Sequence, residues 1–317
     1  MKVRYSYLRE QFARPDEIID EIRKLALSGD FTLGAQVAEF EERFARLIGA
    51  KYAVGVNSGT DALMLSLKAA GVGFGDEVIT AANTFIATAG AVNALGARPV
   101  FVDVTSYYTL DANQVEDAIS SRTKAIVPVH LTGEPADMDD LLDLSERRGI
   151  PIVEDACQAI LAEYRGRKVG TFGLMAGFSL HPLKNLNVWG DAGVIVTDSD
   201  ELYQALELLR NHGMKNRDEI EIFGYNSRLD TIQAIVGNWL IPQVEEITDK
   251  RIENAQVYDA AFGRLGGRIR LPERRPDVKR VYHLYMIQAE DRDELHAHLI
   301  ERGISAKIHY PIPLFLQ

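Results

Sequence analysis

Apolar runs and amphipathic runs alternate along the chain from about residue 15 to residue 215. The short apolar runs predict buried strands, and the longer runs with helical spacing predict helices. Strands are predicted over 52–56, 77–80, 99–104, 125–130 and 151–155, and helices over 15–29, 35–47, 60–70, 85–95, 113–119 and 137–148. Strands that alternate with helices at this spacing predict an α/β fold with a mostly parallel sheet covered on both faces.

The pattern changes after residue 170. Two apolar runs, 172–180 and 192–197, are joined by the loop HPLKNLNVWGD instead of a helix. Further helices are predicted over 200–212, 229–243 and 248–265, followed by a strand–helix–strand group over 282–289, 292–302 and 305–308. We therefore predict a large domain over residues 1–245 and a small C-terminal domain over 246–317.

Composition excludes several classes of partner and location. The 317 residues carry a net charge of −11, which argues against a nucleic-acid or anionic membrane surface, since both need clustered Lys and Arg. Cys157 is the single cysteine and cannot form an internal disulfide, so a reducing cytoplasm is expected. The polar start MKVRYSYLREQ is unlike a signal peptide, and no run approaches the ~20 apolar residues of a membrane span.

Two segments at predicted strand ends offer a phosphate site and an acid. Ligands bind beyond the carboxyl ends of the strands in open α/β sheets. Gly59 and Thr60 open a helix after the strand 52–56, where free N–H groups favour a phosphate; an ordinary capped turn is the alternative. Asp155 ends the strand 151–155 and is suited to pair with a protonated ring nitrogen, although a helix cap or salt bridge would look the same. Gln158 follows and can hydrogen-bond a phenolic oxygen.

Two further segments offer an amine and an aromatic ring. Lys184 lies just beyond the strand 172–180, and in a cavity its pKa would fall and its amine could attack a carbonyl. A surface role is the ordinary alternative for any single lysine. Ser179 is suited to donate to a phosphate, although it could merely pack within the strand. Phe85 is suited to stack on a flat heteroaromatic ring, although a core aromatic is the ordinary reading of this residue by itself. Together the four segments supply the groups that pyridoxal phosphate (PLP) requires. No metal site is predicted.

The segment VEDACQAILAEYRGRKVGTFGLMAGFSLHPLKNLNVWGDAGVIVTD resembles the core motif of the DegT/DnrJ/EryC1/StrS sugar aminotransferases. The resemblance extends from SGTDALMLSLKAAGVGFGDEVI and TFIAT through HLTGEPADMD to GYNSRLDTIQA and HYPIPL, nearly the whole chain. It implies a fold-type-I PLP transferase with a mostly parallel, seven-stranded sheet, helices on both faces and a smaller α+β C-terminal domain. It also implies a homodimer with active sites at the subunit interface.

The resemblance implies a role for each candidate residue. Lys184 would form the Schiff base, exchange the substrate's α-proton and thus act as general base and acid, and Asp155 would keep the pyridine nitrogen protonated. The remaining positions would bind the cofactor: Gln158 at the phenolic oxygen, Phe85 over the ring, Gly59, Thr60 and Ser179 at the phosphate, and Asn226 at the phosphate in the neighbouring subunit. Such enzymes pass an amino group from glutamate to a keto-sugar, commonly nucleotide-linked.

Three departures from the family pattern stand out. Ala192 occupies the third position of a motif that is often GEGG or GDGG, and would cost about 1 kcal/mol if its φ were positive. Cys157 replaces a frequent alanine. The chain also ends soon after HYPIPL, whereas relatives continue, so we expect the small domain to be incomplete.

Two rival functions remain open on the same fold. Sugar dehydratases of the family have a histidine in place of the lysine, so Lys184 argues against that activity. Some relatives were first proposed to be regulatory, so a non-catalytic regulator or sensor is the second alternative. A dinucleotide-binding Rossmann protein is excluded because no G-x-G-x-x-G follows the first strand.

Overall fold

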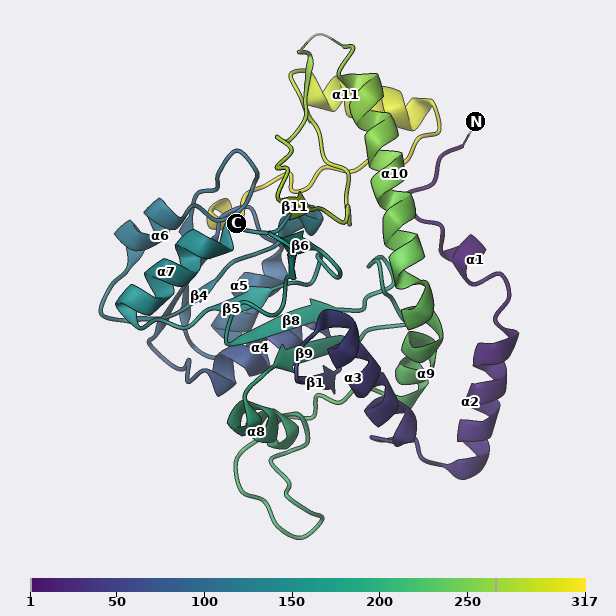
Figure 1. Cartoon of the computed structure of the whole chain (residues 1–317), viewed down its shortest axis with the longest axis vertical. Coiled ribbons are helices and arrows are strands. Elements are labelled where there is room, and N and C mark those ends of the chain that lie inside the picture. The colour runs from purple at the N-terminus through teal and green to yellow at the C-terminus, as the bar shows by residue number, and fades with distance from the viewer. Residues whose placement is uncertain (1, 266) are drawn as a thin grey trace.

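The computed structural model describes residues 2–265 and 267–317, and within them seven strands lie at the centre of the molecule (Figure 1). They are β1 (Tyr52–Val56), β2 (Glu77–Ala81), β3 (Arg98–Val102), β4 (Thr123–Val127), β5 (Val153–Asp155), β8 (Met175–Ser179) and β9 (Gly193–Thr197). Each lies where an apolar run of the sequence predicted a strand. The predicted α/β class is confirmed.

The strand pairings place these elements side by side. β2 pairs in parallel with β3 and with β4, and β5 pairs in parallel with β8. β9 is antiparallel to both β8 and β1. Two parallel bridges, Ile126–Ile152 and Val129–Asp155, connect the β4 side to the β5 side. The strands therefore follow the order β3-β2-β4-β5-β8-β9-β1, in which only β9 runs against the others.

β9 is reversed because of how the chain reaches it. A parallel strand needs a crossover, usually through a helix. Residues 180–192, between β8 and β9, form turns and bends without a helix, as their sequence predicted. The chain therefore turns back directly, and this turn carries Lys184 beyond the end of β8.

Helices cover both faces of the sheet because strand side chains alternate between the faces. On one face, Phe178 of β8 packs with α3 (Ala35–Ile48) and α9 (Thr231–Leu240). On the other, Met175 of the same strand packs with α4 (Gly59–Ala69) and α8 (Asp200–Arg210). The remaining helices of this part are α1 (Leu8–Gln11), α2 (Asp16–Ser28), α5 (Ile86–Ala94), α6 (Ala112–Ala118) and α7 (Met138–Arg148).

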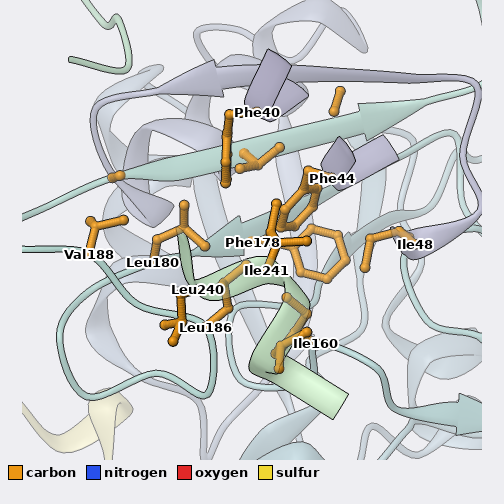
Figure 2. Close-up of a cluster of buried hydrophobic side chains, with 14 of the residues drawn as sticks. Phe40, Phe44, Ile48, Ile160, Phe178, Leu180, Leu186, Val188, Leu240 and Ile241 are labelled. Carbon is orange, nitrogen blue, oxygen red and sulfur yellow. The ribbon is translucent and has the colours of Figure 1, made fainter. Parts of the chain in front are cut away.

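Aromatic side chains dominate the core on the α3 face (Figure 2). The Phe44 ring lies edge-on to the Phe178 ring, with their centroids 5.3 Å apart. A Cβ atom on Gly237 of α9 would lie 2.5 Å from Cε2 of Phe40, so a glycine there allows α9 to approach α3 closely. This close packing holds β8, and therefore the turn after it, against the rest of the sheet.

The C-terminal part of the chain follows the long helix α10 (Val244–Phe262) and returns to the large part, where Tyr310 lies beside Phe85 (Figure 1). It contains β10 (Ile269–Arg270), β11 (Val278–Lys279), β12 (Gln288–Ala289), α11 (Arg292–Glu301) and the short helix η3 (Leu314–Leu316). β11 pairs with β6 (Glu163–Tyr164), which in turn pairs with β7 (Arg167–Lys168). The division into domains at residues 245 and 246 stays a prediction.

Two predicted strands of this part were wrong. Within 282–289 only β12 forms, and residues 305–308, all of them described, contain no strand. The first segment instead bonds to a turn of the large part, where Leu284 N–H donates to Thr132 O over 3.4 Å. The second segment begins at a single bridge between Ile304 and Val3. Apolar alternation does not distinguish a strand from an extended segment bound to a turn.

The expected cost of Ala192 does not arise. Ala192 is buried and is not among the residues with positive φ, whereas Gly190 of the same motif has a φ of 158°. A Cβ on Gly193 would lie 2.2 Å from Ser58 O, so a glycine is required at that position instead.

Among the residues that the structure describes, no helix combines the length and the apolar character needed to cross a bilayer.

Replacing Phe178 by alanine is expected to lower the free energy of unfolding by about 3–5 kcal/mol, because the ring is buried and its loss leaves a cavity. Phe74→Ala is the matched control: this ring is 96% exposed, and we expect a change within about 0.5 kcal/mol. Urea unfolding followed by circular dichroism measures both. Equal losses in the two variants would contradict the assignment of Phe178 to the core.

Candidate active site

Three strand ends meet at one edge of the sheet. Because β1, β5 and β8 run in the same direction, the segments that follow them share that edge. A Cβ on Gly59 would lie 2.6 Å from Cβ of Ser179 and 3.1 Å from Sγ of Cys157. The structure therefore brings the predicted segments after β1, β5 and β8 into direct contact, and only glycine fits at their junction.

The first turn of α4 is open to a ligand. Ser58 caps the helix by accepting a hydrogen bond from Asp61 N–H over 3.1 Å. Thr60, in the same turn, is exposed. The remaining N–H groups of a first helical turn have no partner within the helix and favour an anion. Gly59, Thr60 and Ser179 thus surround one helix N-terminus, as their predicted role requires.

Asp155 is a buried carboxylate with two hydrogen bonds. Its Oδ2 accepts from Thr88 Oγ1 over 2.7 Å, and its Oδ1 accepts from Cys157 N–H over 3.2 Å. The Thr88 hydroxyl in turn lies 2.7 Å from the Thr84 hydroxyl, so Thr84 can donate to Thr88 while Thr88 donates to Asp155. Sequence reasoning missed Thr88, although its spacing of four residues from Thr84 at a helix start was visible.

The neighbouring Glu154 fixes the tip of β5 from the other face. Its carboxylate accepts three backbone N–H groups, those of Gly170, Phe172 and Gly173, each over 2.7 Å. His130 Nδ1 accepts from Ala136 N–H over 3.0 Å, so its proton lies on Nε2, which donates to Glu154 over 3.1 Å. Sequence reasoning missed this pair, because nothing in the apolar pattern around residue 130 indicates a buried polar contact.

Lys184 lies in the turn after β8, where its N–H donates to His181 O over 2.8 Å. Its carbonyl accepts from Asn187 Nδ2 over 3.0 Å, so the backbone is held on both sides. Burial lowers the pKa of its ammonium group below the usual value, and the negative charge of Asp155 opposes this. The predicted amine and carboxylate therefore lie within electrostatic reach of each other.

Cys157 is a packing residue. Burial, together with the negative charge of Asp155, raises the pKa of its thiol well above the usual value. Its Sγ lies 3.6 Å from Gly177 O. A thiol that stays protonated is a poor nucleophile, and the role of Lys184 as the nucleophile stays a prediction.

A cavity of about 1320 Å³ opens above Lys184. Its wall combines the N-terminal segment 3–8, residues of α10 and the segments 282–290 and 304–310. His283 also lines it, and burial together with the charges of Lys184 and Arg251 lowers the pKa of His283 well below the usual value. The imidazole of His283 is therefore neutral at physiological pH.

Phe85, Gln158 and Tyr310 form one group near Asp155. The Phe85 ring is half exposed, with its centroid 5.8 Å from that of Tyr310. Gln158 Oε1 accepts from Thr132 N–H over 2.7 Å. Burial raises the pKa of the Tyr310 hydroxyl to about 12; Gln158 opposes this and Asp155 adds to it.

Asn226 does not join this group within the chain. It is exposed and follows the loop 211–225, where it forms a bridge with Asn211. Its bridge partner Asn211 is not one of the predicted site residues. Its predicted role at a neighbouring subunit stays a prediction.

The site lies at the carboxyl edge of a mostly parallel sheet. It combines an amine of lowered pKa with a buried carboxylate and an open helix N-terminus. These features define an α/β enzyme site suited to a phosphorylated carbonyl compound. Residues 13–317 match the DegT/DnrJ/EryC1/StrS aminotransferase family. The chain belongs to this family. The predictions of an aminotransferase and of PLP as its cofactor are confirmed.

Three relatives show how close the similarity is. The chain is 45% identical over 296 residues to the dTDP-3-amino-3,4,6-trideoxy-alpha-D-glucose transaminase of Streptomyces venezuelae, a match that covers 93% of this chain and 78% of the relative. It is 41% identical over 315 residues to a pleiotropic regulatory protein of Geobacillus stearothermophilus, and this match covers 99% of this chain and 83% of the relative. The crystal structure of S. venezuelae DesV in complex with a ketimine intermediate matches this chain with a TM-score of 0.96 at 43% identity. The match covers 100% of this chain and 85% of the DesV chain.

Trapping experiments test the lowered pKa of Lys184. Because a larger share of its amine is neutral near pH 7, PLP added to cofactor-free protein and reduced with borohydride is expected to label Lys184 before other lysines. Exposed Lys68 is the internal control and is expected to be labelled to a much smaller extent at pH 7. Peptide mass mapping at pH 7 and pH 9 gives the ratio. Equal labelling of the two lysines at pH 7 would contradict the site.

Proposed function

We propose that this protein is a fold-type-I, PLP-dependent aminotransferase that moves an amino group from glutamate to a keto-sugar linked to a nucleotide. The observation that carries the proposal is the Lys184 amine, whose pKa burial lowers, within electrostatic reach of the buried Asp155 carboxylate.

The residues of the site fit PLP. Gly59 lets the start of α4 approach Ser179 so closely that a Cβ would not fit, and this brings the N–H groups of the first helical turn and the Ser179 side chain together for one phosphate. We assign the phosphate to Gly59, Thr60 and Ser179, and the ring nitrogen to Asp155. When bound, the cofactor supplies an electron sink for the carbon that exchanges its proton.

Lys184 and Asp155 divide the proton chemistry between them. A lysine of lowered pKa has a larger neutral fraction near pH 7, so Lys184 Nζ can hold the cofactor, accept the substrate's α-proton and return it. Asp155, fixed by Thr88, keeps a carboxylate beside the ring nitrogen and so favours its protonated form. Phe85 is assigned to the face of the ring and Gln158 to its phenolic oxygen.

The cavity above Lys184 supports a large acceptor. Its volume of about 1320 Å³ exceeds the ~300–1000 Å³ of common small-molecule sites. Its wall carries aromatic and cationic side chains, among them Tyr258, Tyr282, Arg251 and Arg270, which suit a base and a diphosphate. The relative from S. venezuelae is named as a transaminase of a dTDP-sugar, which supports the same class of acceptor. Glutamate as donor rests on the family resemblance.

We also propose a homodimer in which Asn226 reaches the phosphate in the neighbouring subunit. The loop before Asn226 exposes Ile220, Ile222 and Phe223, the last of them 99% exposed. Clustered exposed apolar side chains of this kind favour a protein contact.

A cytoplasmic location remains part of the proposal, because the single Cys157 fits a reducing compartment.

A regulatory function is the second candidate, since the G. stearothermophilus relative is named a pleiotropic regulatory protein. The lowered pKa of Lys184 next to the buried Asp155 favours catalysis, because perturbed pKa values cluster at sites that carry out chemistry. A half-reaction assay distinguishes the two functions.

Glutamate added to the PLP-loaded protein is expected to bleach the visible absorption and release 2-oxoglutarate. Lys184→Ala is expected to slow this half-reaction by roughly 100-fold or more, since the proton-transfer group is lost. Lys68→Ala, at an exposed position of α4, is the control and should react as the wild type does. A wild type that binds PLP but releases no 2-oxoglutarate would favour the regulatory function.

A further inference from the structure

The turn 131–134 fixes which way the Gln158 amide points. Thr132 N–H donates to Gln158 Oε1 over 2.7 Å. Since a backbone N–H can only donate, the amide oxygen must face Thr132, and the Nε2 group must face the opposite way. Gln158 opposes the rise in the pKa of the Tyr310 hydroxyl, as a donor facing that hydroxyl does. The donor side of the amide is thus directed at the group formed by Phe85 and Tyr310.

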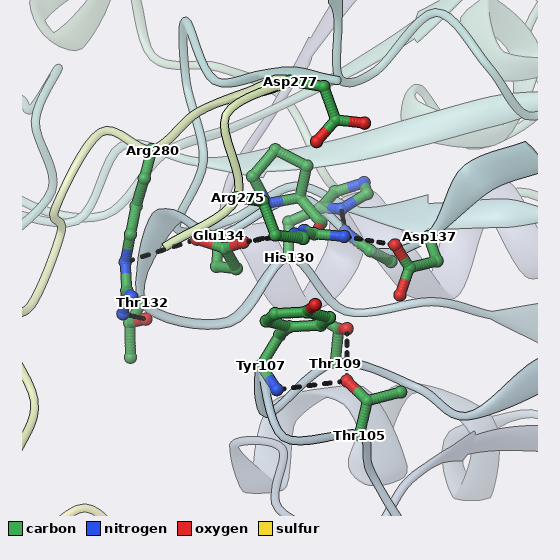
Figure 3. Close-up of polar contacts among 12 residues, drawn as sticks. Thr105, Tyr107, Thr109, His130, Thr132, Glu134, Asp137, Arg275, Asp277 and Arg280 are labelled. Atoms are coloured by element: carbon green, nitrogen blue, oxygen red, sulfur yellow. Dashed lines mark hydrogen bonds and ion pairs between the residues drawn. The ribbon is translucent and has the colours of Figure 1, made fainter. Parts of the chain in front are cut away.

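Arg280 holds this turn from the C-terminal part of the chain (Figure 3). Its side chain is buried, and Nη2 donates to Thr132 Oγ1 over 2.6 Å. The residue after Arg280 also packs closely on the turn, because a Cβ on Gly133 would lie 2.8 Å from Cγ2 of Val281. Thr132 itself has a φ of 60°, a conformation that a threonine keeps only when its surroundings hold it.

Arg280 is not needed merely to attach the C-terminal part of the chain to the large part. Arg275 already donates twice to Glu134, over 2.9 and 2.7 Å, and also bonds to Asp137 (Figure 3). Arg280 lies farther from Glu134, with Nε 3.6 Å from Oε2, and its Nε and Nη1 have no hydrogen-bond partner among the described residues. Its one short side-chain contact is with Thr132.

We propose that Arg280 is a positioning residue that, through Thr132, orients the Gln158 amide so that Nε2 donates to the phenolic oxygen of the cofactor. This inference rests on the proposed function. A donor at that oxygen stabilises its deprotonated form and lowers the pH at which the bound cofactor changes colour. Loosening Thr132 lets the amide turn, and the midpoint of the colour change then rises.

The test is a pH titration of the visible absorption of the PLP-loaded protein. Arg280→Met and Thr132→Val are expected to raise the midpoint by about one pH unit, the effect of losing one charge-assisted hydrogen bond. Thr132→Val keeps the backbone N–H and removes only the hydroxyl that Arg280 binds, so it serves where Arg280→Met does not fold. Arg280→Lys, which retains a donor, is expected to restore part of the difference.

Arg275→Met is the matched control, because Arg275 is buried beside the same Glu134 but does not contact Thr132. It is expected to lower the Tm of the cofactor-free protein and leave the midpoint unchanged. In a Gln158→Ala background, Arg280→Met is expected to add nothing to the midpoint. An equal shift in Arg275→Met, no shift in Arg280→Met and Thr132→Val, or full additivity with Gln158→Ala would overturn the proposal. A wild type without any visible band overturns the proposed function first, before any variant is made.

Discussion

The contact between Gly59, Ser179 and Cys157 is the constraint on which the site depends. The three residues follow β1, β8 and β5, and a single added methyl group at Gly59 would lie 2.6 Å from Cβ of Ser179. Because the strand ends are this close, a helix N-terminus, a buried carboxylate and the turn with Lys184 lie around one small volume. The parallel direction of β1, β5 and β8 supplies this arrangement, and the antiparallel return of β9 turns the chain at Lys184.

Much of the large part could be predicted because local pattern and tertiary structure agree there. The seven strands of the central sheet and the helices α2 to α7 lie within a few residues of their predicted ranges, since buried strands and amphipathic helices have distinct apolar periods. Lys184 and Asp155 could be predicted as a pair because both follow strands of one parallel sheet, and such strands end at the same edge.

Contacts between distant segments could not be predicted in the same way. Thr88 and Asp155 are 67 residues apart, and Arg280 and Thr132 are 148 apart, so no local period relates them. The segment 282–289 failed for a related reason: its alternation is that of a strand, but its backbone partners are turn residues of the large part. Sequence periodicity reports which face a residue occupies and says little about what meets that face.

The two adjacent carboxylates of β5, Glu154 and Asp155, are both buried but have different hydrogen-bond partners. Successive strand side chains point to opposite faces, so Glu154 and Asp155 lie in different surroundings. Glu154 accepts three backbone N–H groups and His130, which satisfies it as a structural anion. Asp155 has only the Thr88 hydroxyl and one backbone N–H among the described residues, which leaves acceptor capacity on its carboxylate for a further donor. A buried charge with spare acceptor capacity is costly unless a ligand uses it, and a protonated ring nitrogen beside Lys184 is the donor that this position suits.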